Sequence, residues 1–350
     1  MFIKKKNNGN SLSRKFRLGE FLAEYIIKSV SFISLAVIVL IFVFVFREAA
    51  PIFSPEEKKI NTEEFLQSET YGEEPSDSSP SNSLEGYSSF NGDGTGDVAD
   101  FKNLTGKDWQ PVGENPKYGL IPIFIGSLKV TIIAILFGAP IAILAAIYSS
   151  LFANKKLREF IKPAIELLAS FPSVVIGFFA LITIATIVQN IFGVSYRLNA
   201  FVGGVAMALA VIPIVYTVTE DSLTAVPKYM SEASLALGAT KWQTALFVVM
   251  PAATPGIFAA LLLGFGRAFG ETMIVLMATG NAPLTSFNIF EPVRTMSATV
   301  GAEMAEVVFG DTHYTVLFFI GVLLFIITFV INAIAEFYVR ARLMKRFRGE

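Results

Sequence analysis

The sequence predicts an all-α integral membrane protein with about six transmembrane helices and both termini in the cytoplasm. Three observations support this fold class. Apolar residues are gathered in long runs and are not spread at the periodicity of core helices or strands. Charged residues make up only 16% of the chain, and most of them lie between the runs. Basic residues are concentrated at both ends of the sequence. Lipid is therefore the expected solvent for most of the chain.

The runs are long enough to be assigned to individual helices, since about 20 apolar residues cross the hydrocarbon core of a bilayer. The predicted spans are Ile26–Phe46, Ile121–Ile147, Phe171–Ile191, Ala200–Val218, Gly256–Met277 and Val316–Ala335. The first run is longer than the core of a signal peptide and is followed by Arg47 and Glu48, not by a small-residue cleavage site. We therefore expect it to be a retained helix.

Charge placement predicts the topology. Lysines and arginines between residues 4 and 17 precede the first span, so the positive-inside rule places the N-terminus in the cytoplasm. The basic loop at 155–162 and the basic tail then also fall inside. The predicted division is 1–24, a basic cytoplasmic segment; 25–47, the first transmembrane helix; 48–117, an acidic and largely disordered extracytoplasmic loop; 118–339, the main transmembrane domain with a cytoplasmic loop near 219–251; and 340–350, a basic cytoplasmic tail. Residues 68–96 have too few apolar side chains to fold and are expected to form a flexible tether.

The composition argues against an enzyme. The chain has no cysteine and a single histidine, His313, and no carboxylate cluster lies inside the apolar spans, so neither a metal site nor a catalytic centre is expected. The nearest approach to a phosphate-binding loop, Gly106-Lys107-Asp108, lacks the upstream glycine and the following Ser or Thr. Any ATP hydrolysis must therefore come from another subunit, and we expect no cofactor in this chain.

The cytoplasmic loop Pro227–Pro251 is predicted to form two short helices. Gly238 suits the left-handed residue that closes a helix, and Thr240 with Gln243 has the spacing of a capping box that opens the next one. An amphipathic hairpin on the membrane surface is an alternative. A DNA-reading helix-turn-helix has the same local pattern, but the flanking membrane spans argue against a nucleic-acid partner.

Two charges interrupt the fifth apolar run, Arg267 and Glu271. A charge near the middle of a bilayer costs at least about 2.5 kcal/mol unless it faces protein or a watery cavity. On a continuous helix their spacing of four residues places both on the face of Ala260 and Gly264. That face is predicted to line a pathway, with a self-neutralising ion pair as the alternative. A guanidinium suits a tetrahedral oxyanion, and the Glu271 carboxylate could accept a hydrogen bond from hydrogen phosphate, which fully ionised sulfate cannot donate.

Other polar residues near the spans are weaker candidates. Glu166 could contact the pathway from the cytoplasmic end of a span, although Lys162 four residues earlier favours an ordinary surface pair. Ser127 and Thr131 are more typical of helix packing than of ligand binding.

Several motifs carry a resemblance to a known family. The loop around Glu232-Ala233-Ser234 and Gly238 resembles the Glu-Ala-Ala loop of permease subunits in ABC importers. More broadly, Phe101–Arg346 resembles the C-type permease subunits of phosphate-specific (Pst) ABC transporters. The matching motifs are Gly266–Met273 (GRAFGETM), Gly280–Asn281 (GN), Leu104–Pro111 (LTGKDWQP), Gly126–Thr131 (GSLKVT), Phe171–Phe179 (FPSVVIGFF) and Ala302–Met304 (AEM), which leads into His313–Tyr314. The long acidic insert and Ile176, where the family often has tyrosine, are departures.

The resemblance implies a type I importer permease in the cytoplasmic membrane of a prokaryote. It implies a second, related permease subunit of the A type, two ATPase subunits of the B type that bind ATP and Mg, and an extracytoplasmic phosphate-binding protein of the S type. It assigns substrate binding to Arg267 and Glu271. It assigns contact with the ATPase to a set in the cytoplasmic loop: Glu232, Ala233, Ser234, Gly238, Ala239 and Trp242.

Three alternatives stay open at the level of the sequence. Sulfate and molybdate permeases share a related Arg-Ala-x-Gly-Glu run, so the anion is less certain than the transporter class. An ion-coupled carrier would need its own coupling-ion site and usually an internal repeat, and neither is evident. A membrane sensor would have little use for charges in the middle of the bilayer.

Overall fold

A computed structural model describes residues 18–53, 101–113 and 115–338. Six helical segments in it are long and apolar enough to cross a membrane, which confirms the predicted number. They are Glu24–Phe53, Ile121–Phe152, Ser173–Phe192, Ala200–Thr224, Lys241–Phe269 and Thr312–Ile334. The basic residues at 4–17, residues 54–100 of the acidic loop with its predicted tether, and the tail at 340–350 lie outside the described residues.

The first transmembrane helix, α1 (Leu18–Ala49), belongs mostly to a separate unit that ends at Arg47. Its sequence is apolar on every face from Leu35 to Phe46, as expected for a helix surrounded by lipid. A short 3-10 turn, η1 (Ala50–Phe53), follows it.

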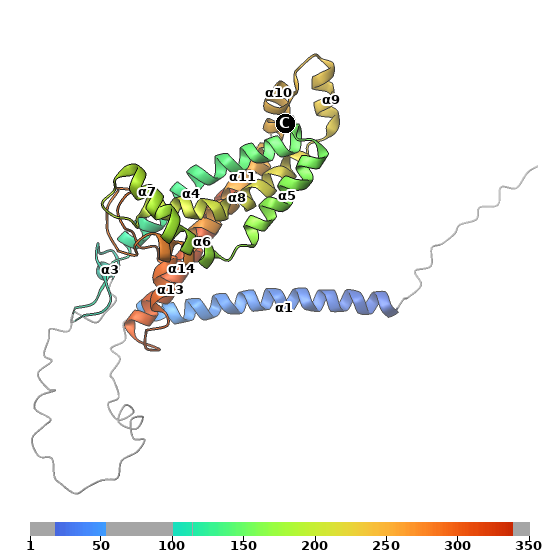
Figure 1. Ribbon diagram of the computed structural model, residues 1–350. Coiled ribbons are helices and arrows are strands. Elements are labelled where there is room, and N and C mark those ends of the chain that lie inside the picture. Colours follow the sequence, from blue (N-terminus) through green and yellow to red (C-terminus); the bar gives the residue numbers. More distant parts are fainter. Residues whose placement is uncertain (1–17, 54–100, 114, 339–350) are drawn as a thin grey trace, which may run out of the picture. The chain divides into compact units, whose positions relative to one another are not determined.

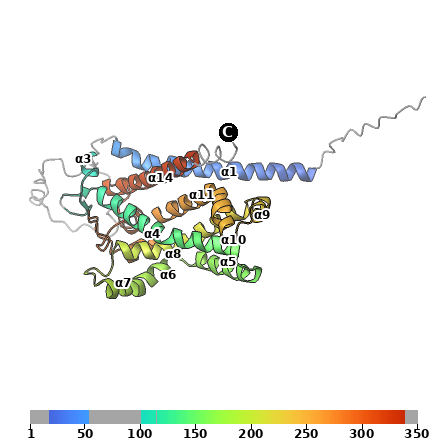
Figure 2. The same cartoon turned by 90° about the horizontal axis from the view of Figure 1, so that it is seen from above.

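The second unit is a bundle built around three long helices, α4 (Ile121–Ile147), α8 (Ala200–Thr224) and α11 (Met250–Phe269). They run side by side in both views (Figures 1 and 2). Small residues permit this close packing: a Cβ added at Gly264 of α11 would lie 2.7 Å from Val215 of α8. Without a side chain at such positions the backbones can approach closely, which drives helix association in lipid.

The segment between α4 and α8 contains a surface helix and the third membrane crossing. The π-helical turn η2 (Tyr148–Phe152) extends α4, and α5 (Lys155–Ser170) begins at the N-cap Asn154, whose side chain accepts a hydrogen bond from the Leu157 amide at 2.9 Å. The crossing consists of α6 (Ser173–Phe179), the π turn η3 (Ala180–Ile184) and α7 (Ala185–Phe192).

One end of the bundle, which the topology places outside the cell, is closed by short elements and the last helix. These are α3 (Phe101–Leu104), β1 (Trp109–Gln110), β2 (Lys117–Tyr118), α12 (Met273–Ala278), α13 (Met296–Glu303) and α14 (Thr312–Tyr338). The two strands pair antiparallel, with Trp109 opposite Tyr118. Both aromatic residues are buried with Leu317 and Ile320 of α14, in a hydrophobic cluster separate from the larger one at the centre of the bundle.

The cytoplasmic end carries a hairpin of α9 (Lys228–Ala236) and α10 (Lys241–Thr244). It extends from the end of the bundle opposite to α3 (Figures 1 and 2). The two short helices of the sequence prediction are therefore present. The second of these helices, α10, is not a separate element, because it continues through the π turn η4 (Ala245–Val249) directly into α11.

Candidate functional site

The fifth crossing corrects the sequence prediction. A single helix was expected from Gly256 to Met277, but the helix runs from Lys241 to Phe269 and breaks at Gly270 before α12 begins. Glycine at 266 and 270 weakens helix continuation because it adds backbone entropy and no side-chain packing. At the break, the Glu271 carbonyl has no partner within the helix and accepts a hydrogen bond from the Ser297 hydroxyl of α13 at 2.6 Å.

The break changes how Arg267 and Glu271 are related. Arg267 occupies the last turn of α11, whereas Glu271 lies beyond the helix end. Glu271 therefore does not continue the helical face that Arg267 shares with Ala260 and Gly264 on α11. Among the described residues no ion pair joins Arg267 to Glu271, so the alternative of a self-neutralising pair is not what forms.

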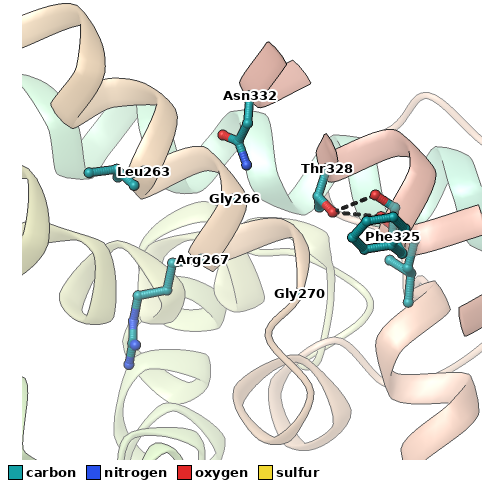
Figure 3. Close-up of a pocket in the computed structure, with 8 residues that line it drawn as sticks. Leu263, Gly266, Arg267, Gly270, Phe325, Thr328 and Asn332 are labelled. Carbon is teal, nitrogen blue, oxygen red and sulfur yellow. Dashed lines mark hydrogen bonds between the residues drawn. The ribbon is translucent and has the colours of Figure 1, made fainter. Parts of the chain in front are cut away.

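The Arg267 side chain borders two cavities. The first, of about 390 Å³, lies between α11 and α14 and is lined by Gly266, Gly270, Thr328 and Asn332 among others. Figure 3 shows the guanidinium extending away from Thr328 and Asn332. The second cavity, of about 290 Å³, is lined by residues of α5, α6 and α8 together with Arg267. We call this second space the Arg267 cavity.

Arg267 is exposed, and its guanidinium makes no hydrogen bond or ion pair with another described residue. Five N–H donors in a fixed fork are thus available where the side chain meets a cavity. In a membrane such a group needs either water or an anion. The arrangement can bind a small tetrahedral oxyanion through two parallel hydrogen bonds.

Glu271 is half-buried and does not line either of these two cavities. The carboxylate that does border the Arg267 cavity is Glu166, near the end of α5. The surface pair expected from Lys162 does not form, because the Lys162 ammonium binds Glu220 of α8, with 3.2 Å between Nζ and Oε2. That hydrogen bond and the charge of Glu220 raise the pKa of Lys162.

The cytoplasmic hairpin has a defined geometry. Gly238 has φ of 89°, and the amides of Gly238 and Ala239 donate to the carbonyls of Leu235 and Ser234, the two bonds of a Schellman motif. The predicted capping box is confirmed: the Thr240 hydroxyl accepts from the Gln243 amide, and the Gln243 side chain accepts from the Thr240 amide at 2.8 Å.

The six residues assigned to ATPase contact divide into two groups by exposure. Glu232, Ala233 and Gly238 are exposed at the tip. Trp242 is exposed as well, and its ring lies 5.5 Å from that of Phe152. Ser234 instead holds the hairpin together through a 3.0 Å hydrogen bond to Thr244. Ala239 is half-buried beside the turn. The hairpin is therefore braced internally and presents its tip outward.

Sequence reasoning missed a polar cluster at the outer end of the bundle. Glu303 accepts a hydrogen bond from the Trp109 indole at 3.1 Å, pairs with Arg294, and lies 2.9 Å from the His313 ring nitrogen. Burial by itself raises the pKa of Glu303, but the hydrogen bonds from His313 and Trp109 and the charge of Arg294 hold it below its ordinary value. Arg294 also donates to Asn281 at 3.1 Å. Residues spread from 109 to 313 give no local signal, so only the tertiary structure brings them together.

Comparison with known proteins identifies the family. Residues 138–343 match the model of the binding-protein-dependent transport system inner membrane component. The chain is 32% identical over 233 residues to the probable ABC transporter permease protein YqgH of Bacillus subtilis, covering 67% of this chain and 75% of that protein. It is 33% identical over 256 residues to the phosphate transport system permease protein PstC of Mesorhizobium japonicum, covering 68% and 77%.

A solved structure supports the fold. The chain superposes on a bacterial ABC transporter involved in the import of the acidic polysaccharide alginate with a TM-score of 0.54 and 14% identity, covering 93% of this chain and 99% of that one. The family match, not this structural likeness, excludes an ion-coupled carrier and a membrane sensor as alternatives. Permeases of this family work with a partner permease, ATPase subunits and a binding protein. The chain belongs to the family of binding-protein-dependent transport system inner membrane components and is the membrane-embedded permease subunit of an ABC importer, not an enzyme.

Proposed function

We propose that this permease forms part of the translocation pathway of an ATP-driven inorganic phosphate importer, with Arg267 as a ligand of the transported anion. The observation that carries the proposal is the position of Arg267 at the broken end of α11, where it lines the Arg267 cavity and its guanidinium has no ion pair or hydrogen bond with the rest of the described chain. Its fork of donors matches two oxygens of a phosphate group. Because relatives of this chain are phosphate transport permeases, we assign phosphate, and not sulfate or molybdate, as the transported anion.

The importer would contain the partners that phosphate systems of this kind use: a second permease of the A type, two ATPase subunits of the B type carrying ATP and Mg, and a binding protein of the S type. The tip of the cytoplasmic hairpin, with Glu232, Ala233 and Gly238 exposed, would dock on the ATPase. The internal bracing of the hairpin supports this role, because a rigid element can pass a movement on to α11. Glu271 remains a candidate ligand from the other side of the helix break.

The experiment is phosphate uptake and phosphate-stimulated ATP hydrolysis by the reconstituted complete importer, with sulfate and molybdate as competing anions. Arg267→Gln removes the charge and the fork, and Arg267→Lys keeps the charge but loses the paired geometry. We expect Arg267→Gln to abolish uptake and Arg267→Lys to retain a small fraction, while both variants assemble with the ATPase. Undiminished uptake by Arg267→Gln would make Arg267 structural, and uptake of sulfate or molybdate in place of phosphate would refute the substrate.

A further inference from the structure

We infer that Glu166 is a second ligand in the Arg267 cavity and the residue through which this permease distinguishes hydrogen phosphate from fully ionised oxyanions. This inference rests on the proposed function and adds a specificity residue to it. Arg267 would bind the unprotonated oxygens of the anion, and the Glu166 carboxylate would accept a hydrogen bond from the protonated one. Glu271 would not take this role.

Glu166 and Arg267 both line this one cavity. Arg267 enters from the end of α11, and Glu166 borders the same space near the end of α5. The other wall is α8, where Thr217 adds a hydroxyl to an otherwise apolar lining that includes Pro213 and Ile214. One ordered water needs only about 10–15 Å³ of such space. A cavity of about 290 Å³ therefore has room for a small hydrated anion between the two charged groups.

The Glu166 carboxylate is free to bind a ligand because the nearby cations of α5 form their ion pairs with a residue of α8. Lys162 and Arg158 both bind the carboxylate of Glu220, a side chain that is 2% exposed. In the part of the chain that the structure describes, Glu166 forms neither an ion pair nor a side-chain hydrogen bond. A carboxylate on the lining that it shares with Arg267 would oppose the entry of an anion that has no proton to donate.

The chemistry of the pair is selective in a way that Arg267 alone is not. An ionised carboxylate only accepts hydrogen bonds, so the anion must supply a proton on one of its oxygens. Hydrogen phosphate and dihydrogen phosphate both carry one, whereas sulfate near neutral pH carries none. Sulfate would therefore face an unpaired carboxylate and like-charge repulsion in the same cavity. A hydrogen bond to a charged group is strong enough to make the binding of phosphate about 10- to 100-fold tighter than that of sulfate.

The test measures direct binding of inorganic phosphate and of sulfate to the complete permease–ATPase complex, without the binding protein, whose own selectivity would mask the effect. The variant is Glu166→Gln, which keeps the shape but can donate a hydrogen bond to sulfate. Glu166→Asp retains the acceptor. Glu159→Gln is the matched control, since Glu159 lies on the same helix, pairs with Lys155 at 3.9 Å and does not line the cavity.

We expect the native complex, Glu166→Asp and Glu159→Gln to prefer phosphate, and Glu166→Gln to lose about 10-fold or more of that preference. If Glu166→Gln keeps the native preference, or if Glu159→Gln loses as much, the role of Glu166 is refuted while the phosphate importer stands. If the native complex binds sulfate as tightly as phosphate, the proposed selectivity of the cavity and the assignment of phosphate fail together.

Discussion

The ion cluster that joins α5 to α8 makes an asymmetric prediction about stability. The Glu220 side chain is 2% exposed, whereas those of Arg158 and Lys162 are 39% and 43% exposed. Removing both cations by Arg158→Ala and Lys162→Ala leaves a buried carboxylate without a partner, which typically costs about 3–5 kcal/mol. Glu220→Gln instead releases two cations that already reach solvent, so its cost should be only about 1–2 kcal/mol.

These free energies translate into separable shifts in thermal stability. For a large domain, each kcal/mol of lost stability lowers the midpoint of thermal unfolding by about 2 °C. The double substitution should therefore lower this midpoint by about 6–10 °C, and Glu220→Gln should lower it by about 2–4 °C. The triple variant should recover part of the loss, because its buried group is neutral. Size-exclusion chromatography of detergent-purified complex after heating would measure all three. A Glu220→Gln variant less stable than the double substitution, or a triple variant with no recovery, would refute the argument.

Two further predictions concern the ends of the bundle. Because the pKa of Glu303 lies below its ordinary value of 4.5, its contribution to stability is present above that value and is lost as pH falls through the lowered pKa. Acidification below about pH 5 should therefore destabilise the native chain more than Glu303→Gln, a difference that melting midpoints measured from pH 7 to pH 4 would reveal; parallel curves would contradict it. Gly238 has φ of 89° with open space around the missing Cβ, so Gly238→Ala should cost only about 1 kcal/mol of hairpin stability while reducing coupled ATP hydrolysis. Full phosphate-stimulated ATPase activity in Gly238→Ala would show that the turn conformation is not needed for coupling.

Local patterns predicted the parts of this protein that depend on local physics. The six crossings follow from length and hydropathy, and the capping box at Thr240 follows from a spacing of three residues. The break at Gly270 was missed because helix continuity was inferred from hydropathy, which carries no information about backbone order inside an apolar run. What holds the broken segment, the Ser297 hydroxyl on the Glu271 carbonyl, joins residues 26 positions apart.

The same limit applied to the candidate site. Lys162 was paired with Glu166 because residues four apart on a helix are neighbours, and this is a sound rule for an isolated helix. In the bundle, the buried Glu220 of α8 binds Lys162 more effectively, because a buried charge without partners is far more costly than an exposed one. Only the packing of α5 on α8 shows that Glu166 lines the Arg267 cavity.

The continuity of one helix connects the cytoplasmic hairpin to the site. From Lys241 to Phe269 the chain forms a single helical segment of 29 residues, about 43 Å long, with the hairpin at its start and Arg267 in its last turn. This segment packs tightly on α8 at Gly264, and α8 in turn holds α5 through Glu220. A force on the hairpin would therefore move Arg267 and Glu166 together. On the proposed function, ATP-driven movement should carry the Arg267 cavity as a rigid body against the second permease, so that access changes while the anion keeps both of its ligands.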